Sequence, residues 1–229
     1  HHTNQRAEPF DADRLNIYAG MQQRQGNDTL SFTVLRNVYQ VEQLPVVNQT
    51  MTRQIHAISG QWRHLVSPRT LFNLFGQFAY LNYHPSSQQS RNVREAMLGV
   101  NVRHALQGEG RPTLLLTGYV GKDWPRDEGV AVVGRTFVGA RVGMEYSLRD
   151  DLDADASVAV EHSDYGGREA LFAQDRNDNL YQALLGLSYR PAEQWLVRPE
   201  IRFSRNTSSI ELNKYSRIEG KLSIRRDFN

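Results

Sequence analysis

Charged or polar side chains occupy every second position of the closing stretch, residues 215–228. Its even positions are apolar or small, and Arg226 is the one charged residue out of step. Successive residues of an extended chain point to opposite faces, so this pattern predicts a strand with one apolar face and one charged face. The charged face could bind, guide or exclude ions. Its polar positions are Arg217, Glu219, Lys221, Ser223, Arg225 and Asp227.

Earlier stretches repeat this alternation and add charges that we expect on the same common face. Opposite charges on neighbouring strands can stabilise the wall of a barrel or act as a filter for passing ions. Both interpretations stay open from sequence. The arginine-rich final strands beside an acidic one further suggest a bias toward anions. The added candidates are Arg103, Arg141, Glu145, Asp153, Asp155, Glu161, Arg190, Arg198, Glu200 and Arg202.

Catalytic and metal-binding chemistry find little support in the sequence. A lipase-like Ser–His pair has one local candidate, the run Glu161-His162-Ser163-Asp164. Adjacent strand residues point to opposite faces, so His162 and Ser163 are not expected to bond each other. The remaining histidines lack the spacing of metal ligands on one face. We therefore predict no enzymatic activity, no metal and no cofactor.

The elements that would position these charges are strands of about ten residues. The strand that follows the turn at residues 26–28 has one charged exception, Arg36, on its apolar face. Such alternation over eleven stretches is typical of strands with water on one side and an apolar medium on the other. The predicted strands cover about 15–25, 30–41, 53–66, 71–83, 95–106, 113–122, 138–147, 153–161, 181–190, 195–204 and 215–228.

The connections between these stretches alternate between short and long. The long ones are predicted at 42–50, 85–92, 123–134, 165–179 and 206–214. Transmembrane barrels have short periplasmic turns, longer external loops and, in single bacterial chains, an even number of strands. The asymmetry predicts a periplasmic C-terminus. The even count predicts about twelve strands, with at least one upstream of Leu15.

Composition agrees with this assignment. The chain has 229 residues, no cysteine and a formal net charge of +2, which argues against a nucleic-acid partner. No apolar run approaches the roughly 18 residues that a membrane helix needs. We predict an all-β, antiparallel up-and-down transmembrane barrel over residues 14–229 in the Gram-negative outer membrane, in contact with its lipid, after a polar segment at 1–13.

A soluble antiparallel barrel or sandwich would also alternate. Three features count against it. The strands exceed the usual globular length of about five or six residues. Opposite charges recur on one face, where a closed small core could not solvate them. Aromatic residues such as Tyr181, Tyr189 and Trp195 lie at strand ends, as an interfacial girdle requires.

The last quarter of the chain resembles the C-terminal barrel of the surface lipoprotein assembly modulator family. Four segments carry the resemblance. They are residues 176–181 (Arg-Asn-Asp-Asn-Leu-Tyr), residues 195–203 with Trp195 and Pro199, the Asn/Ser-rich residues 205–210, and the start of the closing strand from Tyr215 to Arg217. The resemblance implies a barrel that exports surface or secreted proteins. It also implies an upstream periplasmic region of tetratricopeptide repeats, of which this sequence shows none.

Three functions stay open from sequence. The first is a translocation module for an exported protein cargo, working with a periplasmic domain or partner upstream. The second is a general porin or a polysaccharide-export channel. The third is a non-conducting receptor or anchor barrel.

Overall fold

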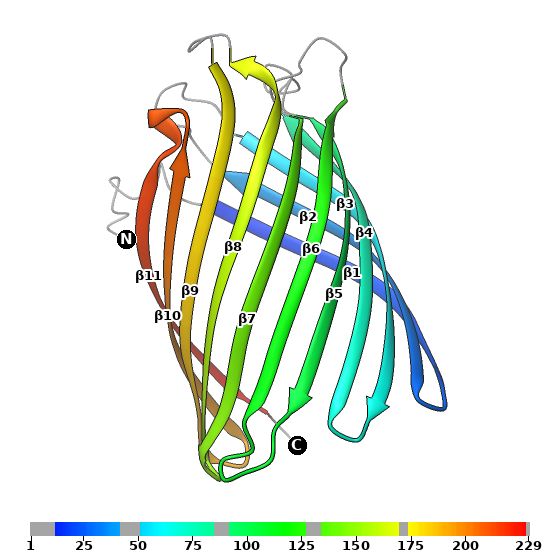
Figure 1. Ribbon diagram of the computed structural model, residues 1–229, viewed down its shortest axis with the longest axis vertical. Helices are drawn as coiled ribbons and strands as arrows, with labels where there is room; N and C mark the ends of the chain where they lie inside the picture. Colours follow the sequence, from blue (N-terminus) through cyan, green and yellow to red (C-terminus); the bar gives the residue numbers. More distant parts are fainter. Residues whose placement is uncertain (1–11, 42–50, 85–91, 127–133, 170–173, 228–229) are drawn as a thin grey trace, which may run out of the picture.

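In the computed structural model, residues 12–41, 51–84, 92–126, 134–169 and 174–227 are described, and most of them lie in β-strands (Figure 1). A short 3-10 helix, Glu211–Asn213, precedes the last strand. No helix in these ranges is long and apolar enough to cross a membrane. The strands are β1 (Ala12–Gln25), β2 (Asp28–Val41), β3 (Met51–Ser67), β4 (Thr70–His84), β5 (Val93–Ala105), β6 (Thr113–Pro125), β7 (Arg135–Arg149), β8 (Leu152–Glu169), β9 (Gln174–Ala192), β10 (Trp195–Ser208) and β11 (Tyr215–Arg226).

The strands form one sheet in sequence order, and each pairs antiparallel with the next. The predicted all-β up-and-down class is confirmed. Two-residue turns at 26–27, 68–69, 150–151 and 193–194 lie at the lower end of the curled sheet (Figure 1). The first of them uses Gly26 at a φ of 58°, a conformation that favours glycine. The short-turn end corresponds to the periplasmic end of outer-membrane barrels.

Several strands continue beyond their predicted ends at the upper, loop-bearing side. The prediction of a loop from 165 to 179 is wrong, because β8 and β9 stay paired out to Glu169 and Gln174. The loop predicted to begin at 123 is also wrong there, since Asp123 pairs with Arg135 in the β6–β7 ladder. Polar residues occupy both faces of these extensions, so their sequences need not alternate between apolar and polar. The first strand likewise begins at Ala12, inside the segment expected to be polar.

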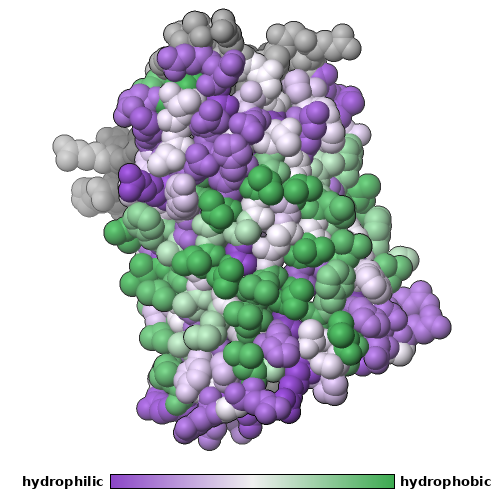
Figure 2. All heavy atoms as spheres, viewed as in Figure 1, coloured by the Kyte–Doolittle hydropathy of each residue, from purple (hydrophilic) through white to green (hydrophobic). Residues whose placement is uncertain are grey.

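Large apolar side chains cover the outer face of the sheet, where a soluble protein would be polar. Figure 2 shows them as a band between two hydrophilic ends. Leu98 is 56% exposed and Leu185 is 63% exposed. We call these residues the apolar belt: Leu15, Ile17, Met21, Leu30, Phe32, Val34, Ile58, Trp62, Leu74, Tyr80, Leu98, Val100, Leu116, Val120, Val138, Val142, Met144, Val158, Val160, Tyr181, Leu185, Leu187, Tyr189, Ile201, Phe203, Ile218, Leu222 and Ile224.

The interior of the sheet contains little apolar core. Among the described residues, the buried apolar side chains are Ala57, Ala79, Phe137 and Ile210. A soluble sandwich or barrel depends on burying such residues for its stability. The soluble alternative is therefore wrong, and the belt residues must be covered by lipid.

The first and last strands lie at the two edges of the sheet. Every step from β1 to β11 is antiparallel, so these two strands run in the same direction (Figure 1). No pairing joins them in the described part of the chain. An antiparallel closure would need an odd number of further strands between them. The eleven strands match those predicted, and a twelfth upstream of Leu15 stays a prediction.

Candidate functional site

The charged face of the sheet is its concave, inner face. Arg103 on β5 reaches Glu145 on β7 at 2.7 Å, across the strand between them. Arg198 on β10 reaches Asp155 on β8 at 2.9 Å in the same way. Side chains from alternate strands converge like this only on the inside of a curved sheet. The polar positions of each strand therefore form an inner wall.

The lower part of this wall holds a cluster of ion pairs that line one cavity of about 610 Å³. Arg190 pairs with Asp153 at 2.7 Å, and Asp153 also accepts a hydrogen bond from the Ser147 hydroxyl at 2.7 Å. Arg198 donates to the Ser188 hydroxyl at 2.9 Å besides its bond to Asp155. We use the name lower cluster for six residues: Arg103, Glu145, Asp153, Asp155, Arg190 and Arg198.

Gly186 makes room for the pair that crosses β9. It lies opposite Asp155 in the β8–β9 ladder. A Cβ at this position would stand 2.7 Å from Asp155 Oδ1 and 3.1 Å from Arg198 Nη2. A side chain there would displace the ion pair. The glycine is thus part of the site, although its residue type alone did not single it out.

Arg141 differs from its neighbours in the same cavity. It is exposed on β7 and lines the cavity beside Glu145. The ion pairs of the described residues include none with Arg141. It therefore presents a guanidinium toward the lumen.

The upper part of the wall holds a second, more buried cluster. Arg135 donates to Asp123 at 2.7 Å and to Glu161 at 3.0 Å. The Tyr119 hydroxyl donates to Glu161 at 2.7 Å, across β7. The Ser163 hydroxyl accepts a further hydrogen bond from Arg135 at 3.2 Å. We use the name upper cluster for five residues: Tyr119, Asp123, Arg135, Glu161 and Ser163.

A neighbouring pair continues this network onto β9. Arg176 bonds Asp178 at 2.6 Å, and its guanidinium lies 4.1 Å from the centre of the Tyr165 ring. Sequence reasoning missed Asp123, Arg176 and Asp178 because it placed them in loops, and it missed Arg135 because the predicted strand began only at Val138. The signal that could have found Arg135 is its parity, since it shares a face with Arg141 on β7.

On the last two strands, the ion pairs run along each strand. Glu200 lies between Arg198 at 3.5 Å and Arg202 at 3.4 Å. On β11, Arg217 pairs with Glu219 at 3.1 Å, and Arg225 pairs with Asp227 at 3.3 Å. Lys221 lies opposite Glu200 in the ladder. These residues extend the charged wall to the edge of the sheet.

The fourteen predicted residues all lie at inner-face positions of their strands. The cavity of the lower cluster brings together seven of them, Glu161 belongs to the upper cluster, and six lie on β10 and β11. The seven are Arg103, Arg141, Glu145, Asp153, Asp155, Arg190 and Arg198. The six are Glu200, Arg202, Arg217, Glu219, Lys221 and Arg225.

The Ser–His candidate is separated by the sheet. His162 lies within hydrogen-bonding distance of the Asn179 side chain at 2.8 Å and of Asp164 at 3.2 Å, on the outer face. Ser163 is 3% exposed on the inner face, next to Glu161 and Arg135. The predicted separation of these two side chains is confirmed. The described residues also contain no group of three or more side chains suited to a metal ion.

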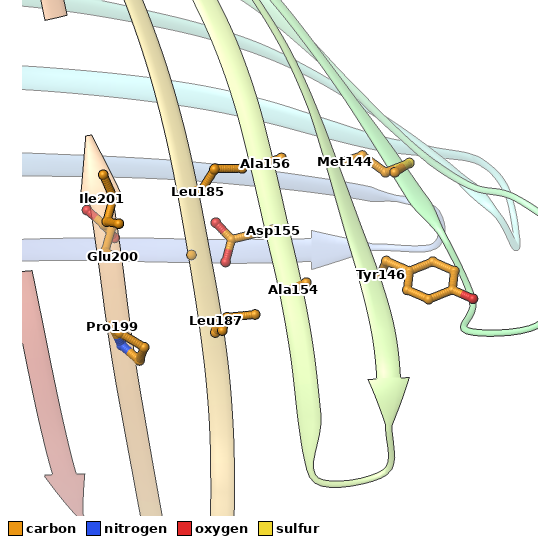
Figure 3. A pocket seen from close by; sticks show the side chains of 11 residues that line it. Met144, Tyr146, Ala154, Asp155, Ala156, Leu185, Leu187, Pro199, Glu200 and Ile201 are labelled. Atoms are coloured by element: carbon orange, nitrogen blue, oxygen red, sulfur yellow. The ribbon is translucent and has the colours of Figure 1, made fainter. Parts of the chain in front are cut away.

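A separate groove lies on the outer face and has a different character. Ala154 and Ala156 form its floor on β8, with Met144 and Tyr146 on one side and Leu185 and Leu187 on the other (Figure 3). Its volume is about 400 Å³. Most of its lining side chains are apolar and point to the outer face, so the groove faces lipid, although Asp155 and Glu200 of the charged wall also border it.

Comparison with known proteins found no matching protein-family model and no matching characterised sequence. Solved structures do match. The copper transporter OprC is 13% identical over 95% of this chain and 42% of its own, with a TM-score of 0.52. A loop-deletion mutant of OmpT, an outer membrane protein of Vibrio cholerae, is 8% identical over 94% of this chain and 98% of its own, with a TM-score of 0.53.

These matches show the fold. The chain has the architecture of a Gram-negative outer-membrane β-barrel, and it spans about two fifths of the length of OprC. The resemblance to the surface lipoprotein assembly modulator family is not matched by any family model and stays a prediction.

Proposed function

We propose that this barrel is the translocation module of a protein that exports surface or secreted proteins across the outer membrane. The observation that carries the proposal is the mixed charge of the inner wall. Cations and carboxylates alternate there within single strands and across neighbouring ones, as in Arg190–Asp153 and Arg217–Glu219. An upstream periplasmic region would deliver the cargo.

A wall of this kind suits a passing polypeptide. A polypeptide carries charges of both signs as well as backbone donors and acceptors, and it must bind weakly enough to leave again. Half-exposed ion pairs contribute only about 0–1 kcal/mol, so exchanging partners with a cargo costs little. The Arg103–Glu145 pair, with side chains 53% and 42% exposed, is of this type. A wall whose charges all had one sign would instead hold the oppositely charged residues of the polypeptide and repel those of like charge.

The export function is tested in the bacterium that carries the full gene. Intact cells with and without the gene are treated with protease, and the released surface peptides are identified by mass spectrometry. We expect a defined subset of surface proteins to disappear from the deletion strain and return on complementation, while their total cellular amounts stay unchanged. An identical surface set in both strains, together with salt conduction by the purified protein, would contradict export.

A second function, an anion-preferring channel, is favoured by the excess of cations on the wall. The fourteen predicted residues comprise eight cations and six carboxylates. Arg141 adds a guanidinium without an ion pair to the cavity of the lower cluster. Rings of Arg and Lys side chains are a known basis of anion selectivity in pores.

The double substitution Arg198→Ala/Arg202→Ala should shift selectivity toward cations. It removes two cations and leaves Asp155 and Glu200 without these arginine partners. A unit charge about 8 Å from a permeating ion in water contributes roughly 0.5 kcal/mol, attractive for an anion and repulsive for a cation. Losing two such charges therefore shifts the anion-to-cation permeability ratio by roughly 2 kcal/mol, or about thirtyfold. The measurement is the reversal potential across a planar bilayer in a gradient of dilute KCl, where screening is weak.

Arg205→Ala is the matched control, because Arg205 lies on the same strand but on its outer face. We expect its reversal potential to equal that of the wild type. An unchanged potential in the double variant would reject a role for these arginines in anion preference.

A further inference from the structure

A row of basic residues lies on the outer face of β2 to β6, at the upper border of the apolar belt. In the strand ladders, Arg36 lies opposite His56, and His56 lies opposite Tyr80. Tyr80 lies opposite Arg94, which lies opposite Trp124. Lys122 is two residues from Trp124, and its ammonium is 5.8 Å from the centre of that ring. We call Arg36, His56, Arg94 and Lys122 the outer basic row.

No carboxylate in the described part of the chain forms an ion pair with the cations of this row. Arg36, Arg94 and Lys122 are exposed. The ion pairs found among the described residues involve the inner wall, the turns and β8, and none includes these three cations. The inner-wall cations of the two clusters, in contrast, mostly have carboxylate partners. Among the described residues the row therefore has no anionic partner, and the surrounding medium could supply one.

For Arg36, the absence of an anionic partner among the described residues carries a free-energy cost. It stands between Val34 and Val38 on the outer face of β2, and its neighbour across the ladder on β1 is the belt residue Ile17. An arginine facing lipid costs about 2–4 kcal/mol at the bilayer midplane and about 0–1 kcal/mol near the interface. Its long side chain can extend upward to the lipid headgroups. An anion at that level would offset the remaining cost.

The row is restricted to one side of the barrel. At the corresponding border of β7 to β9 the outer face carries Thr136, Asn179 and His162, and the histidine lies 3.2 Å from Asp164. On β10 a single cation, Arg205, faces outward. This uneven distribution points to a local binding site and not to a general basic rim.

We propose that the outer basic row binds the phosphate groups of the glycolipid in the outer leaflet. The row lies toward the end opposite the two-residue turns, which is the external end of such barrels. Guanidinium and ammonium groups form strong charge-assisted hydrogen bonds with phosphate. Tyr80 and Trp124 flank the cations, as expected for aromatic residues at the level of the headgroups.

The site is tested by binding fluorescent lipid A to the detergent-folded protein, with dephosphorylated lipid A as the second probe. We expect the wild type to prefer the phosphorylated form. Arg94→Gln/Lys122→Gln should weaken its binding roughly tenfold or more and leave the dephosphorylated form unaffected. Folding of each variant is checked by heat-dependent gel mobility.

Arg205→Gln is the matched control, since it removes one outward cation at the same border but outside the row. It should keep the wild-type affinity. Equal wild-type affinity for the two lipids would overturn the proposal, as would the same loss in Arg205→Gln and in the double variant. Competition by millimolar inorganic phosphate as effective as that by lipid A would show a free-phosphate site and also overturn it. If the double variant does not fold, Arg36→Gln replaces it with the same expected direction.

Discussion

Leu98→Arg is expected to lower the free energy of unfolding from a bilayer by about 2–4 kcal/mol, the cost of an arginine facing lipid near the midplane. Leu98 is 56% exposed in the middle of the apolar belt, opposite Gly76 on β4 and Val120 on β6. None of these neighbours can pair with a guanidinium. The measurement is urea-induced unfolding of the protein reconstituted in phospholipid vesicles.

Met97→Arg is the control for this prediction, because the adjacent residue points to the inner wall. Its neighbours there include Gln77, whose amide bonds Glu95 at 3.2 Å. The new guanidinium meets water and the Glu95 carboxylate, so we expect a change of about 0–1 kcal/mol. Equal losses in both variants would show that Leu98 does not face lipid, and a larger loss in Met97→Arg would reverse the assignment of the two faces.

The contrast between these neighbours explains why much of the fold could be predicted from the sequence. Within the hydrocarbon, each residue of a strand faces either lipid or water, so apolar and polar residues alternate along the sequence. On β7 this gives Val138, Val142 and Met144 outside against Arg141 and Glu145 inside. Eleven strands and their lower turns follow from this rule alone.

Beyond the hydrocarbon the rule no longer applies, and prediction failed there. The upper parts of β8 and β9 carry polar residues on both faces, so Asp164 and Asn177 could pair in a ladder without any apolar–polar alternation in the sequence. For the same reason Asp123 was expected in a loop, and Arg135 was left outside the strand predicted from Val138. Strand pairing outside the membrane depends on backbone hydrogen bonds, which leave little trace in residue types.

The contacts of the site were also beyond the reach of sequence. Arg198 meets Asp155 across an intervening strand, although the two residues are 43 positions apart in the chain. Which residues meet in this way depends on strand tilt and register, and on the space left by Gly186. The sequence predicted that these side chains face inward, but not which of them would form pairs.

The upper cluster provides the prediction with the second large effect. Arg135→Met is expected to lower the free energy of unfolding by about 2–4 kcal/mol, because breaking a partly buried ion pair leaves uncompensated carboxylates. Asp123 is 8% exposed, and its Oδ1 atom has no hydrogen-bond partner in the described part of the chain. Arg135 is thus the main partner of this carboxylate, and it serves Glu161 as well.

Arg103→Met is the matched control, because Arg103 bonds Glu145 at the same 2.7 Å distance on the same wall but in a half-exposed pair. There water replaces the lost partner, and we expect a loss below about 1 kcal/mol. A double-mutant cycle isolates the cause. If Arg135→Met acts through the stranded carboxylate, then Arg135→Met/Asp123→Asn should recover part of the stability in urea unfolding. Additive losses would instead mean that the packing of Arg135 against the Phe137 ring, 4.5 Å away, matters more than its charge.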